Sequence, residues 1–125
     1  MEKIMAKVLV VDDSQTEIFK LKEMLERNGH SVLTAESGED GVRVATDEQP
    51  DVVLMDIVMP GLNGFQATRQ LTKASGTAHI PVIMVTMKNQ ETDRVWGSRQ
   101  GARAYLTKPV VEKDLVQAIA EFVRH

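Results

Sequence analysis

Cysteine is absent from this 125-residue chain, and its absence excludes several kinds of chemistry. No disulfide can form, no thiol can act as a nucleophile, and the usual structural zinc sites lack their ligands. The composition is compatible with a reducing cytoplasm, which is the location we expect. The first residues form no apolar signal-like stretch, and no apolar run approaches the roughly 20 residues of a membrane-spanning helix.

Aromatic residues are also scarce, and the positive charges are not clustered. The chain has three Phe, one Tyr and one Trp, and its net charge is -3 without any basic cluster. A nucleic-acid surface needs a positive stripe or a stacking platform, so we expect no direct nucleic-acid partner. The length suits one domain, and no repeat, linker or low-complexity segment interrupts it. We therefore expect a single domain over residues 1–125.

Short apolar segments alternate with helical patterns along the chain. The helical patterns lie at about 14–28, from 37 towards Pro50, and at about 63–73, 91–99 and 112–124. The first begins with a capping-box pattern, Ser14 to Glu17, whereas the fourth is weakly patterned. The apolar segments are at 8–11, 31–35, 52–55, 82–85 and 104–106. This alternation predicts an α/β fold with a parallel sheet covered by helices on both faces.

Polar residues follow four of the predicted strands directly. They are two adjacent aspartates, a third aspartate, a threonine and a lysine: Asp12, Asp13, Asp56, Thr86 and Lys108. The carboxyl ends of parallel strands lie along one edge of a sheet, where such folds bind ligands. Crowded carboxylates raise one another's pKa unless a cation lies among them, and hard oxygen ligands suit Mg²⁺. A hydroxyl and an ammonium beside that ion would suit a phosphoryl group.

Each of these residues also has an ordinary explanation. Asp12 and Asp13 are of a type that is common at helix starts, and Asp56 could belong to the turn that follows it. Thr86 is a good strand former, and Lys108 could be a solvated loop charge. The coincidence of all these residue types at strand ends favours a metal-assisted phosphoryl site.

Four segments resemble the receiver domain of bacterial two-component response regulators, the CheY-like family. They are Val10–Ser14, Leu54–Gly64, Val85–Thr86 and Thr107–Pro109. The resemblance extends over essentially the whole chain. It implies a flavodoxin-like (βα)₅ doubly wound fold in three α/β/α layers, with strand order 2-1-3-4-5.

The resemblance also implies roles for the residues at the strand ends. Asp56 would accept a phosphoryl group from a phosphohistidine on a partner kinase. Mg²⁺ would be held by three carboxylates and one backbone carbonyl, those of Asp12, Asp13, Asp56 and Val58. Thr86 and Lys108 would contact the phosphoryl oxygens, and the Lys108–Pro109 bond would be cis. Such a protein is a signalling module that catalyses its own phosphorylation and dephosphorylation, not an enzyme that acts on a separate substrate.

Family behaviour further implies a switch. Thr86 would move on phosphorylation and Tyr105 would follow, and the output would be read on the face formed by the fourth helix, fifth strand and fifth helix. Trp96 in the fourth helix has two readings, a partly packed inner-face residue or an aromatic anchor for a partner on that face. Val58 and Lys88 flank the route of water to the phosphoryl group and should tune self-hydrolysis.

Within the family, segments 56–73 and 90–110 look most like a stand-alone regulator of twitching motility. We therefore expect a receiver without an output domain, in chemotaxis-like signalling linked to type IV pili. Its partners would be a chemotaxis-type sensor histidine kinase and a downstream protein, and it would be a monomer or weak dimer. It would signal by docking on another protein, or alternatively it would act as a phosphate sink that drains phosphoryl groups from a shared kinase.

Three rival functions stay open. A pseudo-receiver would share the fold and bind partners without taking phosphate, although Asp56 and Lys108 speak against it. A haloacid-dehalogenase-like phosphatase would need Asp-x-Asp on the first strand, whereas Asp12 and Asp13 are adjacent. A flavodoxin-type carrier would need a hydroxyl- and glycine-rich loop there. The histidines His30, His79 and His125 show no metal-ligand spacing, and we expect solvated side chains.

Overall fold

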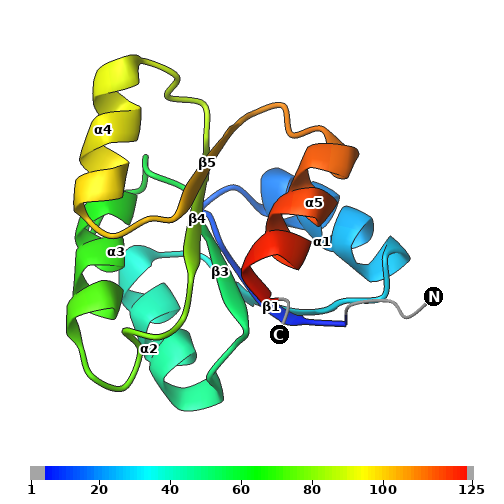
Figure 1. Cartoon of the computed structure of the whole chain (residues 1–125), viewed down its shortest axis with the longest axis horizontal. Helices are drawn as coiled ribbons and strands as arrows, with labels where there is room; N and C mark the ends of the chain where they lie inside the picture. Colours follow the sequence, from blue (N-terminus) through cyan, green and yellow to red (C-terminus); the bar gives the residue numbers. More distant parts are fainter. Residues whose placement is uncertain (1–4, 124–125) are drawn as a thin grey trace.

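The computed structural model describes residues 5–123, which form five strands and five helices in strict alternation (Figure 1). The strands are β1 (Lys7–Val11), β2 (Ser31–Ala35), β3 (Val52–Met55), β4 (Val82–Thr86) and β5 (Ala104–Thr107). The helices are α1 (Gln15–Arg27), α2 (Gly38–Glu48), α3 (Gly64–Lys73), α4 (Glu91–Arg99) and α5 (Glu112–Val123). All ten elements were predicted from the sequence, with small differences at their ends.

The five strands make one parallel sheet in the order β2-β1-β3-β4-β5, which confirms the predicted topology. β1 lies beside β3, with Val11 opposite Met55. Since these residues end their strands, the residues that follow emerge side by side at the carboxyl edge of the sheet. Asp12 and Asp56 are therefore neighbours because of the register.

Successive residues of the central strands point to opposite faces of the sheet, and each face is covered by helices. Val8 and Val10 of β1 pack with α1 and α5, whereas Leu9 and Val11 pack with α2 and α3. Figure 1 shows the same division, with α1 and α5 on one side of the sheet and α2, α3 and α4 on the other. The predicted α/β/α layering is confirmed.

The helix ends show how local and tertiary contacts compete. Asn63 and Gln66 form a full capping box at α3, with both hydrogen bonds present. At α1 only half of the expected box forms, because Ser14 Oγ accepts from the amide of Glu17 but the Ser14 amide donates to Asp12. The carboxylate of Glu17 is therefore left for other contacts.

His30 corrects the expectation of a solvated side chain. It lies buried at the turn into β2, and its Nδ1 accepts a hydrogen bond from the amide of Ala6 at 3.0 Å. Burial lowers the pKa of His30 from its ordinary value. His79 is exposed, as expected, whereas His125 lies outside the described residues. Within residues 5–123, no helix combines the length and apolar character that a bilayer crossing requires.

Candidate functional site

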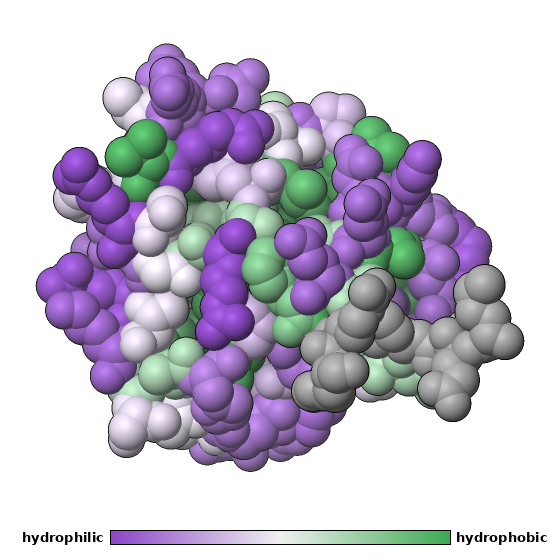
Figure 2. All heavy atoms as spheres, in the orientation of Figure 1, coloured by the Kyte–Doolittle hydropathy of each residue, from purple (hydrophilic) through white to green (hydrophobic). Residues whose placement is uncertain are grey.

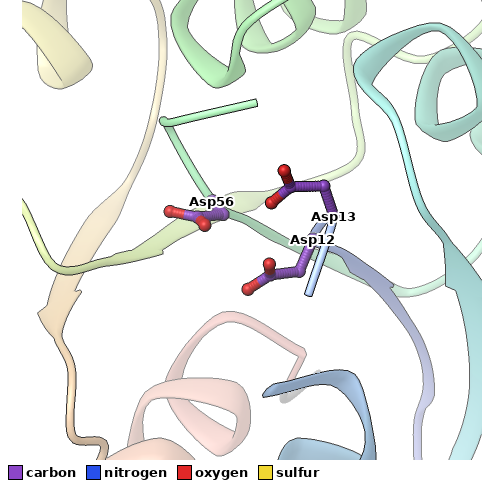
Figure 3. Close-up of side chains that lie close together, drawn as sticks. All are labelled: Asp12, Asp13 and Asp56. Carbon is purple, nitrogen blue, oxygen red and sulfur yellow. The ribbon is translucent and has the colours of Figure 1, made fainter. Parts of the chain in front are cut away.

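Three aspartates meet at the carboxyl edge of the sheet. Asp12 and Asp13 follow β1, Asp56 follows β3, and one carboxylate oxygen from each lies within 4.8 Å of the others. Figure 3 shows all three side chains extending to the same side of the two strand ends. Asp12 and Asp56 are buried and Asp13 is exposed, so the cluster is open to solvent on the side of Asp13. These hard oxygen donors fit a divalent ion of the Mg²⁺ type.

Lys108 brings a positive charge into the same cluster from the end of β5. Its Nζ lies 2.6 Å from Oδ2 of Asp12 and 3.3 Å from Oδ2 of Asp56. The side chain is only 8% exposed, so these contacts are shielded from water. The ammonium therefore offsets part of the negative charge that the carboxylates concentrate here.

The pKa values of Asp12 and Lys108 are shifted by burial and by the hydrogen bonds and charges around them. Burial raises the pKa of the Asp12 carboxyl, and the hydrogen bonds from Lys108 and from the Ser14 amide oppose that rise. Burial alone would lower the pKa of Lys108, but the hydrogen bond to Asp12 and the charge of Asp56 outweigh it and raise the pKa. The lysine is consequently held in its charged form.

The backbone that follows Asp56 is closely packed. Oδ1 of Asp56 accepts a hydrogen bond from the next amide, Ile57, at 2.7 Å, and the amide of Gly64 donates to the Ile57 carbonyl at 2.9 Å. A Cβ on Gly64 would lie 2.0 Å from the carbonyl oxygen of Asp56, so only glycine fits where α3 begins. Val58 lies in this loop with an exposed side chain.

Thr86 ends β4, and Tyr105 is the second residue of the neighbouring strand β5. Thr86 is fully buried, and its Oγ1 accepts a weak hydrogen bond from the Lys88 amide at 3.4 Å. The hydroxyl of Tyr105 donates to the carbonyl of Lys88 at 2.6 Å. Lys88 thus connects the predicted switch residues through its backbone. The Lys108–Pro109 bond is cis, as predicted.

Trp96 lies on α4 with 49% of its surface exposed, as does its neighbour Val95 at 47%. Among the residues of α4, only Gly97 is buried, against the side chains of Met84 and Tyr105. About half of the Trp96 side chain is therefore open to a partner and about half is packed, so both the partly packed role and the anchor role stay predictions.

Two contributors to the site were missed from the sequence. Glu17, interpreted as half of a capping box, places its carboxylate 3.9 Å from Lys108. Arg94 lies 4.8 Å from the centre of the Tyr105 ring and donates to Thr107 Oγ1 at 3.1 Å. The sequence around Glu17 or Arg94 does not indicate these contacts, because both depend on how a helix and a distant strand pack together.

A comparison with protein families shows to which family this fold belongs. Residues 8–120 match the response regulator receiver domain. The chain belongs to this family. Receiver domains bind Mg²⁺ at the acidic pocket, and the cluster of Asp12, Asp13 and Asp56 corresponds to such a pocket.

Of two curated relatives, one is matched over nearly its whole length and the other over about half of its length. Protein PilH of Pseudomonas aeruginosa is 69% identical over 115 residues, which covers 92% of this chain and 95% of PilH. The transcriptional regulatory protein PhoP of Bacillus subtilis, named for alkaline phosphatase synthesis, is 35% identical over 94% of this chain. This chain spans only 48% of PhoP.

Solved structures agree with the fold. The chemotaxis protein CheY4 of Vibrio cholerae superposes with a TM-score of 0.88 at 28% identity, covering 95% of this chain and 99% of CheY4. The receiver domain of a sensor histidine kinase from Pseudomonas aeruginosa has a TM-score of 0.89 at 26% identity, and covers 98% of this chain and all of that domain. That structure contains a magnesium ion coordinated in its active-site cleft.

Proposed function

We propose that this receiver takes a phosphoryl group on Asp56 from a phosphohistidine of a sensor histidine kinase, in a reaction that requires Mg²⁺. The observation that carries the proposal is the joint placement of Lys108 and three carboxylates at one sheet edge. No single residue of this set would suffice, because the reaction needs a nucleophile and compensation of its charge together.

In the proposed reaction, a carboxylate oxygen of Asp56 forms a bond to phosphorus as the bond from phosphorus to the donor imidazole nitrogen breaks. An ionised carboxylate and an anionic phosphoryl group repel, so the charge of Lys108, 3.3 Å from Asp56, stabilises their approach. The hydrogen bond from the Ile57 amide fixes the orientation of the Asp56 carboxylate. Thr86 and Lys108 would then contact the phosphoryl oxygens as donors.

The residues present fit a magnesium ion. Asp12, Asp13 and Asp56 would hold it through carboxylate oxygens, together with the backbone carbonyl of Val58. When bound, the ion supplies further neutralisation of the negative charge that accumulates during transfer. Asp13 is the most exposed of the three carboxylates and gives the ion access from solvent.

The proposed output is a change in the packing of Thr86 and Tyr105. A phosphoryl group at Asp56 adds acceptor oxygens at the strand ends, which attracts the Thr86 hydroxyl and disturbs the backbone of Lys88. Trp96 and Tyr105 would then present the altered face to a downstream protein. Figure 2 shows pale and hydrophobic atoms between α4 and α5, interspersed with hydrophilic ones, a mixture that is common in protein interfaces.

The approach of a kinase is supported by a cavity of about 390 Å³ that opens beside Lys108. Its walls come from α1 and from the loops after β4 and β5, and they are mostly apolar: Leu21, Met24, Met87, Pro109 and Val110, with Glu17 and Lys20 at the polar side. A donor protein could pack side chains there while its phosphohistidine reaches Asp56.

The biological role that we propose is chemotaxis-like control of type IV pilus twitching motility, as the similarity to PilH suggests. The receiver would act as a monomer or weak dimer in the cytoplasm. It would signal by docking when phosphorylated, or it would drain phosphoryl groups from a shared kinase. Deletion of the gene should alter twitching on a surface, and unchanged twitching would contradict this role.

Incubation with acetyl phosphate and Mg²⁺, followed by intact mass spectrometry, tests the chemistry. We expect one phosphoryl group on the wild-type protein, and none on Asp56→Asn or without Mg²⁺. Failure of the wild type with every phosphodonor would favour the pseudo-receiver instead. An adduct that persists in Asp56→Asn would contradict the assigned acceptor.

A further inference from the structure

The loop between β3 and α3, residues 56–63, carries both the proposed phosphoacceptor and the proposed carbonyl ligand of the metal. Its first residues are fixed by the hydrogen bonds of Ile57 and Gly64 described above. Val58 projects a side chain that is 61% exposed, so side-chain packing does little to hold its carbonyl in place. The side chains of Ile57 and Met59 on either side are buried in the core, and contacts made by the loop backbone restrict Val58 further.

The first turn of α2 makes such contacts. Oε2 of Glu39 accepts a hydrogen bond from the amide of Leu62 at 3.2 Å. A Cβ on Gly38 would lie 2.2 Å from the carbonyl oxygen of Leu62, so the two backbones touch directly. Gly61 has a φ of +74°, and a Cβ there would lie 2.9 Å from Oε2 of Glu39. Gly38 thus lets the two backbones come together, and Gly61 leaves room for the Glu39 carboxylate.

A glutamate in the first turn of a helix has an ordinary explanation, since a negative charge there is favoured by the helix dipole. In α2, however, Ser37 already caps the helix by accepting from the amide of Asp40 at 3.1 Å. The Glu39 carboxylate is directed to an amide 23 residues away in the chain instead. Its contact is therefore between α2 and the loop, not within the helix.

We propose that Glu39 is a positioning residue of the metal site, which holds the loop that carries Val58 in its binding conformation. This inference rests on the proposed function, because it requires that the Val58 carbonyl is a ligand. The hydrogen bond fixes Leu62 and, through the three intervening residues of the loop, limits the positions open to Val58. Loss of the bond would leave the aspartates in place but let the loop sample other conformations, and Mg²⁺ would then bind more weakly.

Isothermal titration with Mg²⁺ alone tests the proposal on the full chain. We expect Glu39→Ala to weaken binding by about 3- to 10-fold, a smaller effect than the 10- to 100-fold typical of groups bonded directly to a ligand. Glu39→Gln keeps an acceptor oxygen and should stay within about 2-fold of the wild type. Asp40→Ala is the matched control, because it removes a charge from the same turn and its side chain contacts Arg43 on its own helix.

Amide hydrogen exchange in the absence of metal supplies a second readout. Glu39→Ala should accelerate exchange at Leu62 specifically, while Asp40→Ala should not. If Glu39→Ala exchanges faster at Leu62 but binds Mg²⁺ as tightly as Asp40→Ala does, the positioning role is contradicted. Unchanged exchange at Leu62 would overturn the contact itself. Equal weakening in Glu39→Gln and Glu39→Ala would assign the effect to charge, which also contradicts the proposal.

The variant Asp13→Asn distinguishes a failure of this inference from a failure of the proposed function. If the wild type binds Mg²⁺ and Asp13→Asn does not, the metal site stands and the Glu39 variants decide the positioning role alone. If the wild type binds no Mg²⁺, the proposed function fails and the positioning role fails with it.

Discussion

The ammonium of Lys108 lies 2.6 Å from a carboxylate oxygen of Asp12, and both side chains are almost completely buried. The lysine occupies a position among the same carboxylates that are proposed to hold Mg²⁺. Two cations that neutralise one set of carboxylates compete for it electrostatically. We therefore expect the lysine both to stabilise the metal-free fold and to weaken the binding of Mg²⁺.

Replacement of Lys108 by methionine should show both effects. We expect the free energy of unfolding without metal to fall by about 2–4 kcal/mol, because buried carboxylates lose their partner. Mg²⁺ affinity should rise about 3- to 10-fold as a competing charge is lost, and saturating Mg²⁺ should restore much of the stability. Urea unfolding with and without Mg²⁺ measures both quantities.

Lys20→Met is the matched control for that experiment. Lys20 is exposed and pairs with Glu17 at 3.6 Å, so its loss should change stability by less than about 0.5 kcal/mol. Weaker Mg²⁺ binding in Lys108→Met would show that the lysine organises the carboxylates and does not compete with the metal.

Gly64→Ala should damage both the fold and the site. The new Cβ would lie 2.0 Å from the Asp56 carbonyl oxygen and 2.7 Å from the Ile57 Cα, and neither backbone atom can move without moving Asp56. We expect a loss of about 3 kcal/mol or more in unfolding free energy, together with slower phosphorylation by acetyl phosphate.

Gly76→Ala provides the comparison, because a Cβ there meets nothing within 4 Å. That variant should be neutral or more stable by about 0.4–1 kcal/mol, since alanine restricts the unfolded chain. A Gly64→Ala protein with wild-type stability would mean that the start of α3 has more freedom than its contacts indicate.

The sequence was informative about the site because the three aspartates, Thr86 and Lys108 all lie at or just after the end of a predicted strand. Apolar runs that stop at Asp12 and Asp56 locate the carboxyl ends of β1 and β3, and parallel topology then brings those ends together. Periodicity likewise predicted the buried face of α1, where Ile18, Leu21 and Leu25 lie in the core. These features depend on local pattern and on one topological rule.

The rest depends on contacts between distant segments. Glu17 matched a capping box, but Asp12 takes the Ser14 amide and leaves Glu17 near Lys108. His30 follows a turn glycine and was expected to be solvated, yet its ring is buried and accepts a hydrogen bond from the amide of Ala6, on another segment. No local pattern encodes either partner.

Arg94→Ala should loosen α4 without disturbing the rest of the fold. The guanidinium packs on the Tyr105 ring and donates to Thr107, whereas the helix itself buries only Gly97. We expect a loss of about 0.5–1 kcal/mol and faster amide exchange in α4, with exchange in α3 unchanged.

Arg99→Ala, at the exposed end of the same helix, controls for the loss of one arginine. Arg94→Lys should rescue little, because lysine lacks the planar group that stacks on the ring. Equal exchange rates in Arg94→Ala and Arg99→Ala would contradict the role of Arg94 in holding α4 against β5.

His30 should make stability depend on pH in a definite direction. Burial lowers its pKa below the ordinary 6.5, so the unfolded chain binds a proton more readily than the folded one. Stability is therefore fully present above pH 6.5 and falls as the pH drops from there towards the folded-state pKa, by up to about 1.4 kcal/mol per pH unit. Protonation of Nδ1 would also break the hydrogen bond from the Ala6 amide.

Urea unfolding from pH 5 to 8 should show this loss of stability relative to His30→Gln, which keeps an acceptor but cannot titrate. The exposed His79 provides the control, since His79→Gln should keep the wild-type dependence. Parallel curves for the wild type and His30→Gln would rule out His30 as the source.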